Sequence, residues 1–469
     1  MSVTEIVEGI RKLMGIDHAQ CKAFIGERAQ KLLGQITIDR AEFDRYDVKR
    51  GLRNADGTGV MAGVTRIAST QGYYMRDGER RAMEGKLYYR GIDVSEIVQG
   101  FLSEGRHGYE ETAYLLIFGD LPNKGELDTF RDILEEYREL PNHFSEDMIL
   151  AAPSKNIMNK MARSILALYS YDDKPEVDER NLRRELTRAL HILAQTPVIV
   201  AHAYAAKRHY FDMEGLHLHR SQKGYSIAEN FLHGVRDDNS FTPEEAKLLD
   251  LCMVLHADHG GGNNSAFACR VLTSSGTDIY SSISAAIGSL KGPRHGGANE
   301  KVMEMFSFIK KDVKDWRDEQ EVAAYLYKIV CGEAAAGDGL IYGMGHAVYT
   351  ISDPRALMLK DLARNLAKKK GFLNEFELME LVEHLAPEAL GKAKGSPVEI
   401  CANVDMYSGL VYKMLGIPEA LYTPLFAIAR MAGWCAHRLE EVWSGGKIIR
   451  PAYKAIGLDK EYVPLEERI

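Results

Sequence analysis

Residues 291–299 read KGPRHGGAN and place one histidine, His295, between a glycine-proline pair and a glycine-rich run. An apolar segment with helical spacing, residues 279–290, stops at Gly292-Pro293, and a second periodic segment, residues 298–309, starts just after. We therefore expect His295 to lie in a tight turn at the start of a helix. A helix N-terminus disfavours an added positive charge, so the pKa of this imidazole should be lowered and the ring should be a neutral hydrogen-bond donor. Taken alone, a turn histidine without chemistry would be the simpler interpretation.

The composition is typical of a soluble globular protein. The chain has 469 residues, of which 45% are hydrophobic, enough for a large core and two or three domains. The net charge of -8 includes no basic block, which argues against binding to nucleic acid or to an anionic membrane. We expect no membrane span, because no run of about eighteen apolar residues occurs. The N-terminus carries no import signal, and six scattered cysteines without a CxxC pair indicate reduced thiols, so we expect a cytoplasmic protein.

Helical periodicity dominates the chain, and one β signal lies near its start. Short alternating runs over residues 59–93 surround Asp77-Gly78, which predicts a hairpin. The predicted fold class is therefore mainly α-helical with a small β-hairpin near the N-terminus. No glycine-rich phosphate loop follows a strand, which excludes Rossmann and P-loop folds. Helices are expected in an N-terminal arm within residues 1–50 and over residues 109–118, 125–140, 159–171, 181–209, 242–259, 278–290, 298–309 and 316–336.

Two helix starts carry capping signals. Thr242 followed by Pro243 and Glu245 predicts a capping box at the first of them. Thr423 followed by Pro424 predicts the N-cap of the last long helix. These signals indicate where two buried helices of the core begin.

Three further stretches gather polar groups beside glycines. Residues 256–267 read HADHGGGNNSAF and end a buried helix, so their polar groups need partners, and a ligand is one candidate. Residues 337–356 read GDGLIYGMGHAVYTISDPRA, and their glycines let the backbone approach closely around His346. Residues 403–409 read NVDMYSG and place Asp405 before an apolar helix, which this aspartate could simply cap. Lys392 and Lys394 are expected in a loop just before this stretch.

Taken in order, KGPRHGGAN, GMGHAVYTISDPR and NVDMYSG resemble the citrate synthase family, and the similarity runs from residue 32 to residue 451. The resemblance implies a two-domain helical fold, with residues 1–296 and 412–469 in a large domain and residues 297–411 in a small one. It also implies a homodimer with shared active sites that condenses acetyl-CoA with oxaloacetate. No metal or redox cofactor is implied, since the coenzyme A thioester is a substrate.

The family's functional residues can be carried over motif by motif. One histidine of the family stabilises the enol of acetyl-CoA, an aspartate removes the methyl proton, and a second histidine polarises the ketone of oxaloacetate. By resemblance these are His295, Asp405 and His346. The expected substrate-binding residues are Arg355, Arg430, Arg450, His259, Asn263 and Asn403, with His256 and Ser265 in support.

The chemistry of these side chains suits that reaction independently of the resemblance. A thioester α-proton is a very weak acid, so a carboxylate removes it only where a placed donor stabilises the developing enolate. Oxaloacetate carries two carboxylates, and planar guanidinium groups bind carboxylates in a bidentate manner better than lysine does. Simpler interpretations remain for two residues: Arg430 could form a structural ion pair, and His256 could be a core histidine.

The sequence departs from the family pattern at several positions. Gly260 replaces a glutamate, and Arg294 stands where a small or apolar residue is common. Thr350 and Ile351 occupy the place of basic residues that meet the coenzyme A phosphate. We therefore expect the coenzyme A site to use Lys392 and Lys394 instead.

Three alternative functions stay open at this stage. A 2-methylcitrate synthase would use propionyl-CoA, and one methylene in an apolar pocket is worth only about 1–3 kcal/mol. A metal hydrolase is suggested by HADH, although Val254 stands where its first histidine would be. A non-catalytic helical relative would have no need of His295, His346, Asp405 and three arginines together.

Overall fold

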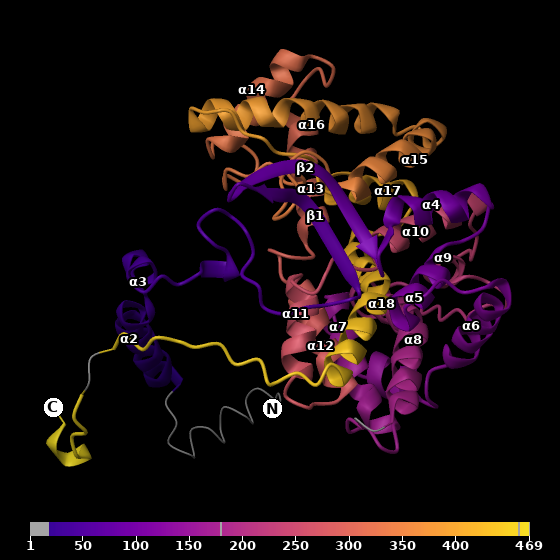
Figure 1. The fold of residues 1–469 in the computed structure, drawn as a ribbon, viewed down its shortest axis with the longest axis horizontal. Coiled ribbons are helices and arrows are strands. Elements are labelled where there is room, and N and C mark those ends of the chain that lie inside the picture. Colours follow the sequence, from indigo (N-terminus) through magenta and orange to yellow (C-terminus); the bar gives the residue numbers. More distant parts are fainter. Residues whose placement is uncertain (1–17, 179–180, 458–459, 469) are drawn as a thin grey trace, which may run out of the picture. The chain divides into compact units, whose positions relative to one another are not determined.

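The computed structural model describes residues 18–178, 181–457 and 460–468 in two compact units, Met1–Ala62 with Pro451–Ile469, and Gly63–Arg450 (Figure 1). The first unit contains the helices α2 (His18–Ile36) and α3 (Arg40–Arg45) and two short 3-10 helices, Arg50–Leu52 and Leu465–Glu467. The predicted helical arm is therefore confirmed from residue 18 onward, and its first 17 residues lie outside the described part.

The predicted hairpin opens the second unit. Strand β1 (Ala68–Arg76) pairs antiparallel with β2 (Glu79–Tyr89), and Arg76 faces Glu79 across the turn. The two turn residues, Asp77 and Gly78, have φ values of 55° and 80°. Positive φ at both positions is the signature of a type I′ turn, whose twist matches that of the strands. A short strand β3 (Ile92–Asp93) extends the sheet to the order β1-β2-β3.

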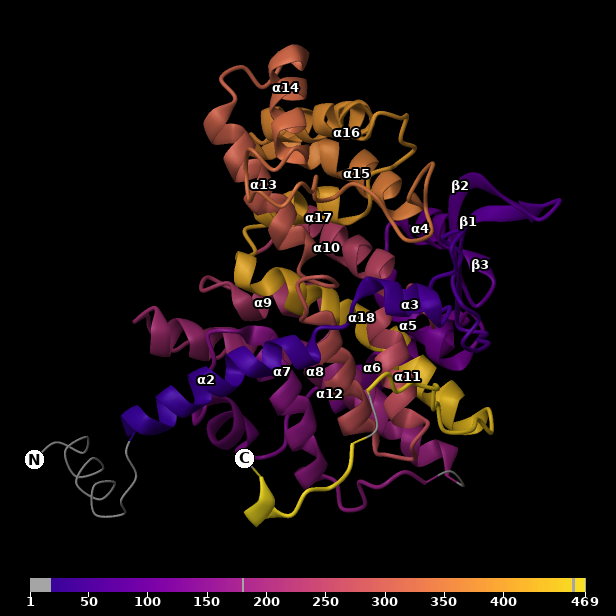
Figure 2. The same cartoon turned by 90° about the vertical axis from the view of Figure 1, so that its left-hand side faces the viewer.

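The remainder of Gly63–Arg450 is helical, which confirms the predicted fold class (Figures 1 and 2). Short π and 3-10 turns lie at Ser145–Leu150, Leu168–Tyr171 and Glu419–Leu421. The α-helices are α4 (Val94–Ser103), α5 (Tyr109–Phe118), α6 (Lys124–Tyr137), α7 (Ile157–Ala167), α8 (Leu182–Phe211), α9 (Ile227–Val235), α10 (Pro243–His256), α11 (Asn264–Thr273), α12 (Ile279–Leu290), α13 (Ala298–Asp312), α14 (Glu319–Val330), α15 (Pro354–Lys370), α16 (Leu373–Lys394), α17 (Asp405–Met414) and α18 (Tyr422–Trp443).

Helix α18 lies at the centre of this unit. Its residues from Tyr422 to Leu439 are all buried, and it packs against α5, α7, α8, α10, α11 and α12. A helix that is apolar on every side belongs in a core. Its few charged side chains therefore need partners inside the protein or from a ligand.

Helix α8 is the one described helix that is long and apolar enough to cross a membrane, with a mean hydropathy of 1.2 over its best window. Of that window, 72% is buried inside the protein. It also packs against α6, α7, α9 and α18. Burial against neighbouring helices accounts for its apolar sequence.

Two local predictions need correction. Thr423 does not cap α18, because the helix already begins at Tyr422; the Thr423 hydroxyl instead donates to the Gly296 carbonyl (3.2 Å). Lys392 and Lys394 do not lie in a loop but in the last turn of α16, which continues until Gly395 adopts a left-handed φ of 69°. Cations in a last turn complement the helix dipole. By contrast, the predicted capping box of Thr242 and Glu245 is confirmed.

Candidate active site

The loop that carries His346 is tied to the segment before Asp405. Met344 and Ala402 form an isolated antiparallel bridge, and the Gly345 N–H donates to the Cys401 carbonyl (2.8 Å). Gly343 and Gly345 have φ values of 84° and 92°, which confirms that glycine is needed here. A Cβ on Gly343 would also meet the Met406 backbone at 3.0 Å. The two motifs are therefore in contact although they are distant in the sequence.

The hydrogen bonds of His346 fix its tautomer. The backbone N–H groups of Val348 and Tyr349 both donate to Nδ1, each at 3.1 Å. A nitrogen that accepts two hydrogen bonds carries no proton, so the ring is neutral and its proton lies on Nε2. The Tyr349 ring stacks on the imidazole with centroids 4.5 Å apart. His346 is therefore a fixed hydrogen-bond donor through Nε2.

His295 is fixed with the opposite nitrogen protonated. It lies in the predicted tight turn, and its Nε2 accepts from the Ser265 N–H (3.3 Å) and lies 3.0 Å from the Ser265 hydroxyl. The neutral ring therefore carries its proton on Nδ1. Trp434 holds the serine in place by donating from its indole N–H to Oγ (3.1 Å). The Asn263 side-chain oxygen lies 2.8 Å from the same hydroxyl.

The pKa of His295 is lowered as predicted, but for a different reason. Burial lowers it to about 4, and the charge of Arg430 acts in the same direction. The helix α13 begins only at Ala298, with Gly297 as its N-cap, so His295 lies outside the cap position. The imidazole is thus neutral at physiological pH because it is buried beside a guanidinium group.

Asp405 is the first residue of α17 and follows Val404, which occupies the N-cap position, so Asp405 is not the N-cap. The Asn403 side chain caps the helix start instead, since its Oδ1 accepts the Asp405 N–H (3.0 Å) while its Nδ2 donates to the Gly345 carbonyl (2.9 Å). Asn403 therefore connects the Asp405 and His346 segments, and its contact with substrate stays a prediction. The carboxylate of Asp405 remains available for chemistry.

The pKa of Asp405 is raised to about 6. Burial is the main cause, and the nearby charge of Asp353 adds to it, while Arg355 and Arg430 act in the opposite direction. A carboxylate with such a pKa is still ionised at neutral pH and is a stronger base than an ordinary aspartate. The environment of Asp405 is thus that of a general base.

Two buried arginines face the histidines. Arg355 makes a bidentate pair with Asp353, at 3.0 Å from Nε and 2.7 Å from Nη2. Arg430 donates from Nε to the His256 carbonyl (2.6 Å), whereas its Nη1 and Nη2 are buried without a partner. Burial lowers the pKa of Arg430 to about 10, so it stays charged at neutral pH. A buried guanidinium with two unpaired nitrogens is a site for a carboxylate ligand.

His259 and His256 complete this anion-binding region. His259 Nε2 and His256 Nδ1 are both buried without a hydrogen-bond partner. Burial, with the charges of Arg355 and Arg430, holds the pKa of both rings well below the ordinary value, so both are neutral. Each ring can therefore donate to a ligand without adding positive charge. His256 also packs on Phe426, with ring centroids 4.4 Å apart, so it belongs to the core as well.

The turn that carries these two histidines is held by residues that sequence analysis missed. Asp258 is fully buried, accepts the Gly260 N–H (2.6 Å) and pairs with His437 Nε2 (3.0 Å). Gly433 lets α18 approach, because a Cβ there would lie 2.1 Å from the Asp258 carboxylate. His437 lies far from Asp258 in the sequence, so only the fold brings the pair together.

The hairpin also positions the site. A Cβ on Gly72 would lie 2.5 Å from the Val348 carbonyl, and one on Gly85 would lie 2.1 Å from the Ser352 carbonyl. The Gly85 N–H donates to the Ser352 hydroxyl (3.1 Å). Both strands thus pack directly on the segment between His346 and Arg355. Two glycines in a strand pattern were the available sequence signal, since they often mark close backbone approach.

Not every predicted site residue joins this cluster. Arg450 is exposed at the end of the unit, and the preceding residue, Ile449, donates its N–H to Ser274 at the far end of α11 (3.0 Å). Lys392 and Lys394 are exposed, and Lys392 Nζ lies 4.8 Å from the centroid of the Tyr327 ring. Within the described part of the chain, none of these three residues forms a hydrogen bond or ion pair with the predicted histidines.

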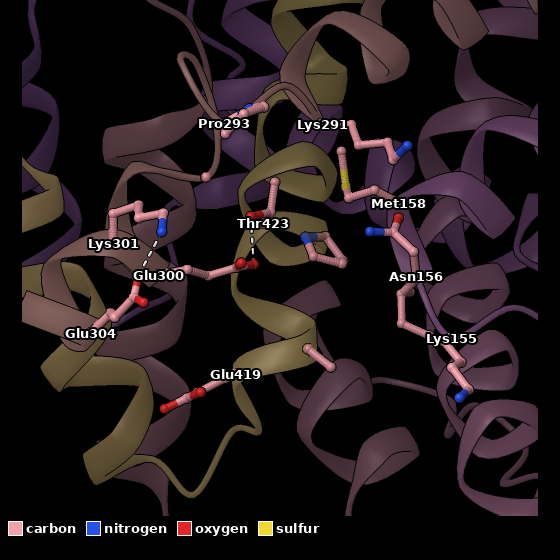
Figure 3. Close-up of a pocket in the computed structure, with 14 residues that line it drawn as sticks. Lys155, Asn156, Met158, Lys291, Pro293, Glu300, Lys301, Glu304, Glu419 and Thr423 are labelled. Carbon is pink, nitrogen blue, oxygen red and sulfur yellow. Dashed lines mark hydrogen bonds and ion pairs between the residues drawn. The ribbon is translucent and has the colours of Figure 1, made fainter. Parts of the chain in front are cut away.

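A cavity of about 340 Å³ opens beside the His295 turn, and Figure 3 shows its lining. Pro293 and Gly297 form part of its wall, Lys301 pairs with Glu304, and the Thr423 hydroxyl lies 3.0 Å from the Glu300 carboxylate. None of the predicted catalytic residues lines it. The predicted catalytic residues therefore lie in the buried cluster and not around this cavity.

The cluster combines the parts needed for carbon–carbon bond formation next to a carbonyl. Asp405 can remove a proton, and His295 Nδ1–H and His346 Nε2–H can each stabilise an oxygen on which negative charge develops. Arg430, Arg355 and His259 can hold a dianionic acid. Among the residues described, no group of three or more His, Cys, Asp or Glu side chains is arranged to hold a metal ion.

Comparison with known proteins gives a consistent result. A family model described as the citrate synthase C-terminal domain matches residues 56–452. Citrate synthase from Synechocystis sp. is 34% identical over 412 residues, covering 88% of this chain and 93% of that protein. 2-Methylcitrate synthase from Shewanella oneidensis is 28% identical over 389 residues, which cover 81% of this chain and 92% of that protein. Among solved structures, this chain resembles citrate synthase from Thermoplasma acidophilum in complex with carboxymethyl coenzyme A and oxaloacetate. The TM-score is 0.72 at 26% identity, and the alignment covers 90% of this chain and 99% of that one.

Proposed function

The chain belongs to the citrate synthase family of acyl-transferring enzymes, and we propose that it condenses acetyl-CoA with oxaloacetate and water to give citrate and coenzyme A. One observation carries the proposal: a carboxylate with a raised pKa, Asp405, shares a buried site with two histidines whose tautomers are fixed as donors. A protein that only bound these acids would not need a base.

In the proposed first step Asp405 removes a methyl proton of the thioester. The His295 Nδ1–H donates to the thioester oxygen and stabilises the enol or enolate that forms. A neutral imidazole suits this role, since its lowered pKa keeps it a donor without an added charge. Asp405 then carries the proton that it has taken.

In the proposed second step the nucleophilic carbon attacks the ketone carbon of oxaloacetate. His346 Nε2–H polarises the ketone oxygen, while Arg430 Nη1 and Nη2 bind one carboxylate and Arg355 and His259 assist. A new carbon–carbon bond forms while the ketone C=O π bond breaks, and the resulting alkoxide takes the proton of His346 Nε2. Water then attacks the thioester carbonyl, and coenzyme A leaves as its thiol. These side chains supply every proton and charge required, so the proposal includes no metal or redox cofactor.

The proposal includes two domains and a homodimer. His295, His259 and Arg430 come from the proposed large domain (residues 1–296 and 412–469), and His346 and Asp405 from the proposed small domain (residues 297–411). Arg450 is proposed to complete the site of the partner subunit. In support, Ile449 is anchored at Ser274, beyond the end of α11, whereas Ser265 and the catalytic cluster lie at its start. Ten helical residues separate these ends by about 15 Å.

The phosphate of coenzyme A is proposed to meet Lys392 and Lys394, whose charges are exposed at the end of α16. We also propose a cytoplasmic location, in keeping with the buried thiols of Cys252, Cys269, Cys401 and Cys435.

Propionyl-CoA is the second candidate substrate, because a 2-methylcitrate synthase is among the relatives. A thiol-release assay with oxaloacetate decides between them. We expect the higher kcat/KM with acetyl-CoA. A higher kcat/KM with propionyl-CoA would instead indicate a 2-methylcitrate synthase. If neither thioester released thiol, the proposed reaction would be contradicted.

A further inference from the structure

The side chain of Arg138, directly after α6, is buried and forms no ion pair within the described residues. Only 7% of the residue is exposed, and its Nη1 is buried without a hydrogen bond. In the described part of the chain no carboxylate forms an ion pair with it. Burying a charge costs several kcal/mol unless a counter-charge and hydrogen bonds compensate. An arginine in this position therefore indicates a ligand that the protein alone does not supply.

Glu110, in the first turn of α5, faces the same cavity with an unpaired oxygen. It is 2% exposed, its Oε1 accepts the Ile227 N–H (2.7 Å), and its Oε2 is buried without a partner. Among the neighbouring carboxylates, Glu110 raises the pKa of Arg138 the most, although burial lowers that pKa overall. Yet the two side chains form no ion pair within the described residues. Both side chains line the same cavity, so one molecule bound there can contact the cation and the anion together.

The cavity measures about 400 Å³ and lies between the start of α5, one face of α6 and the start of α9. A third buried nitrogen without a partner, His107 Nε2, also faces it. Most other charged groups of its wall have partners within the protein. Arg106 pairs with Glu104 and Glu111, and Glu135 accepts the Gly224 N–H (2.8 Å). Asp250, the remaining buried carboxylate nearby, accepts the Gly108 and Tyr109 N–H groups. Buried atoms without a hydrogen-bond partner are thus Glu110 Oε2, Arg138 Nη1 and His107 Nε2, while His107 Nδ1 lies 3.9 Å from Glu229.

We propose that this cavity binds an α-amino acid, with its carboxylate on Arg138 and its ammonium group on Glu110. The zwitterion supplies a negative group for the guanidinium and a donor for the carboxylate in one small molecule. A lone anion would leave Glu110 unpaired and add a second negative charge beside it. A lone cation would leave Arg138 unpaired. The volume also leaves space for a side chain, since small-molecule sites begin at roughly 300 Å³.

Calorimetric titration of the full-length protein with L-alanine, L-glutamate and L-lysine tests this proposal. Acetate, which has only the carboxylate, and methylammonium, which has only the ammonium group, are the controls. We expect at least one of the amino acids to bind at one site per chain and both controls to bind at least tenfold more weakly. Absence of binding for all three amino acids, or equally tight binding of acetate, would overturn the proposal and indicate ordered water or an adventitious ion only.

Two variants locate the binding. Arg138→Met removes a charge that has no partner, and Glu110→Gln keeps the oxygen that accepts the Ile227 N–H, so both chains should fold, which thiol-release activity checks. Each should weaken amino-acid binding at least tenfold. Arg317→Met, an exposed arginine whose side chain is 75% accessible, is the matched control and should bind as the unchanged protein does. Unaltered binding in both cavity variants would place the amino acid elsewhere and contradict the assignment.

Discussion

His259 and His346 meet edge to face, with ring centroids 4.9 Å apart and ring planes at 82°. The two residues come from different motifs, and Tyr349 packs against both rings. Their contact places the donor proposed for the ketone next to the group proposed for a carboxylate. Asn403 connects the Gly345 carbonyl with the Asp405 N–H, so the segment that carries His346 is also held to the proposed base.

The pKa of Asp405 predicts how activity depends on pH. The carboxylate acts as a base only when ionised, and its pKa is raised to about 6. We therefore expect kcat/KM for acetyl-CoA to be constant near neutral pH and to fall about tenfold per pH unit below that pKa. The measurement is a pH profile of the free enzyme. A constant value down to about pH 4 would show that Asp405 is not the group that titrates.

Arg430→Met should weaken the binding of oxaloacetate and have little effect on the stability of the fold. Two nitrogens of this buried guanidinium have no hydrogen-bond partner in the protein, so they are available to a bound anion. We expect the dissociation constant of oxaloacetate to rise about 100-fold or more, equivalent to about 3 kcal/mol, while the melting temperature does not fall greatly. Calorimetry and thermal unfolding measure the two effects. The exposed Arg317→Met is the control, and unchanged oxaloacetate binding in Arg430→Met would refute the assignment.

Gly85→Ala should disturb the site through the hairpin. Its Cβ would lie 2.1 Å from the Ser352 carbonyl and 2.9 Å from the Pro354 ring. The forced shift should cost about 1–3 kcal/mol of unfolding free energy and lower turnover, since this segment carries His346 and Arg355. Gly100→Ala is the matched control, because no atom lies within 4 Å of its Cβ and it lies inside α4. Equal stability and turnover in the two variants would contradict the proposed contact.

Arg450 should act across the dimer interface. Chains with Arg450→Ala and chains with Asp405→Ala, each inactive alone, are mixed after dissociation and allowed to reassemble. If the site is shared, one site of each mixed dimer has both residues intact, so activity should return to roughly a quarter of the unchanged level. If Arg450 serves its own subunit, every site lacks one residue. Mixed dimers without activity would then exclude the exchange.

Local patterns in the sequence predicted local structure well. Asp77-Gly78 predicted the hairpin turn, and Thr242 with Glu245 predicted a helix start, because both signals depend on neighbouring residues alone. The start of α18 was wrong by a few residues, since the Thr423 hydroxyl finds its partners in the His295 turn instead of its own helix. Lys392 was placed in a loop, whereas α16 continues through Gly391 and ends only at Gly395.

Contacts between distant residues could not be read in the same way. The motifs identified His295 and Asp405, but not Ser265 and Trp434 as the pair that fixes the His295 tautomer, or Asn403 as the cap that frees Asp405. Nor did periodicity show that Gly85 contacts the segment after His346. These relationships depend on tertiary packing, which hydrophobic periodicity does not encode.

The most direct test of the proposed function is thiol release by Asp405→Asn. This substitution keeps the shape of the side chain and removes the base, and the Asn403 cap of α17 is untouched. Turnover with acetyl-CoA and oxaloacetate should fall by about 1,000-fold or more, while calorimetry should show that oxaloacetate still binds. Turnover within about tenfold of the unchanged enzyme, with the substitution verified, would contradict the assignment of Asp405 as the base.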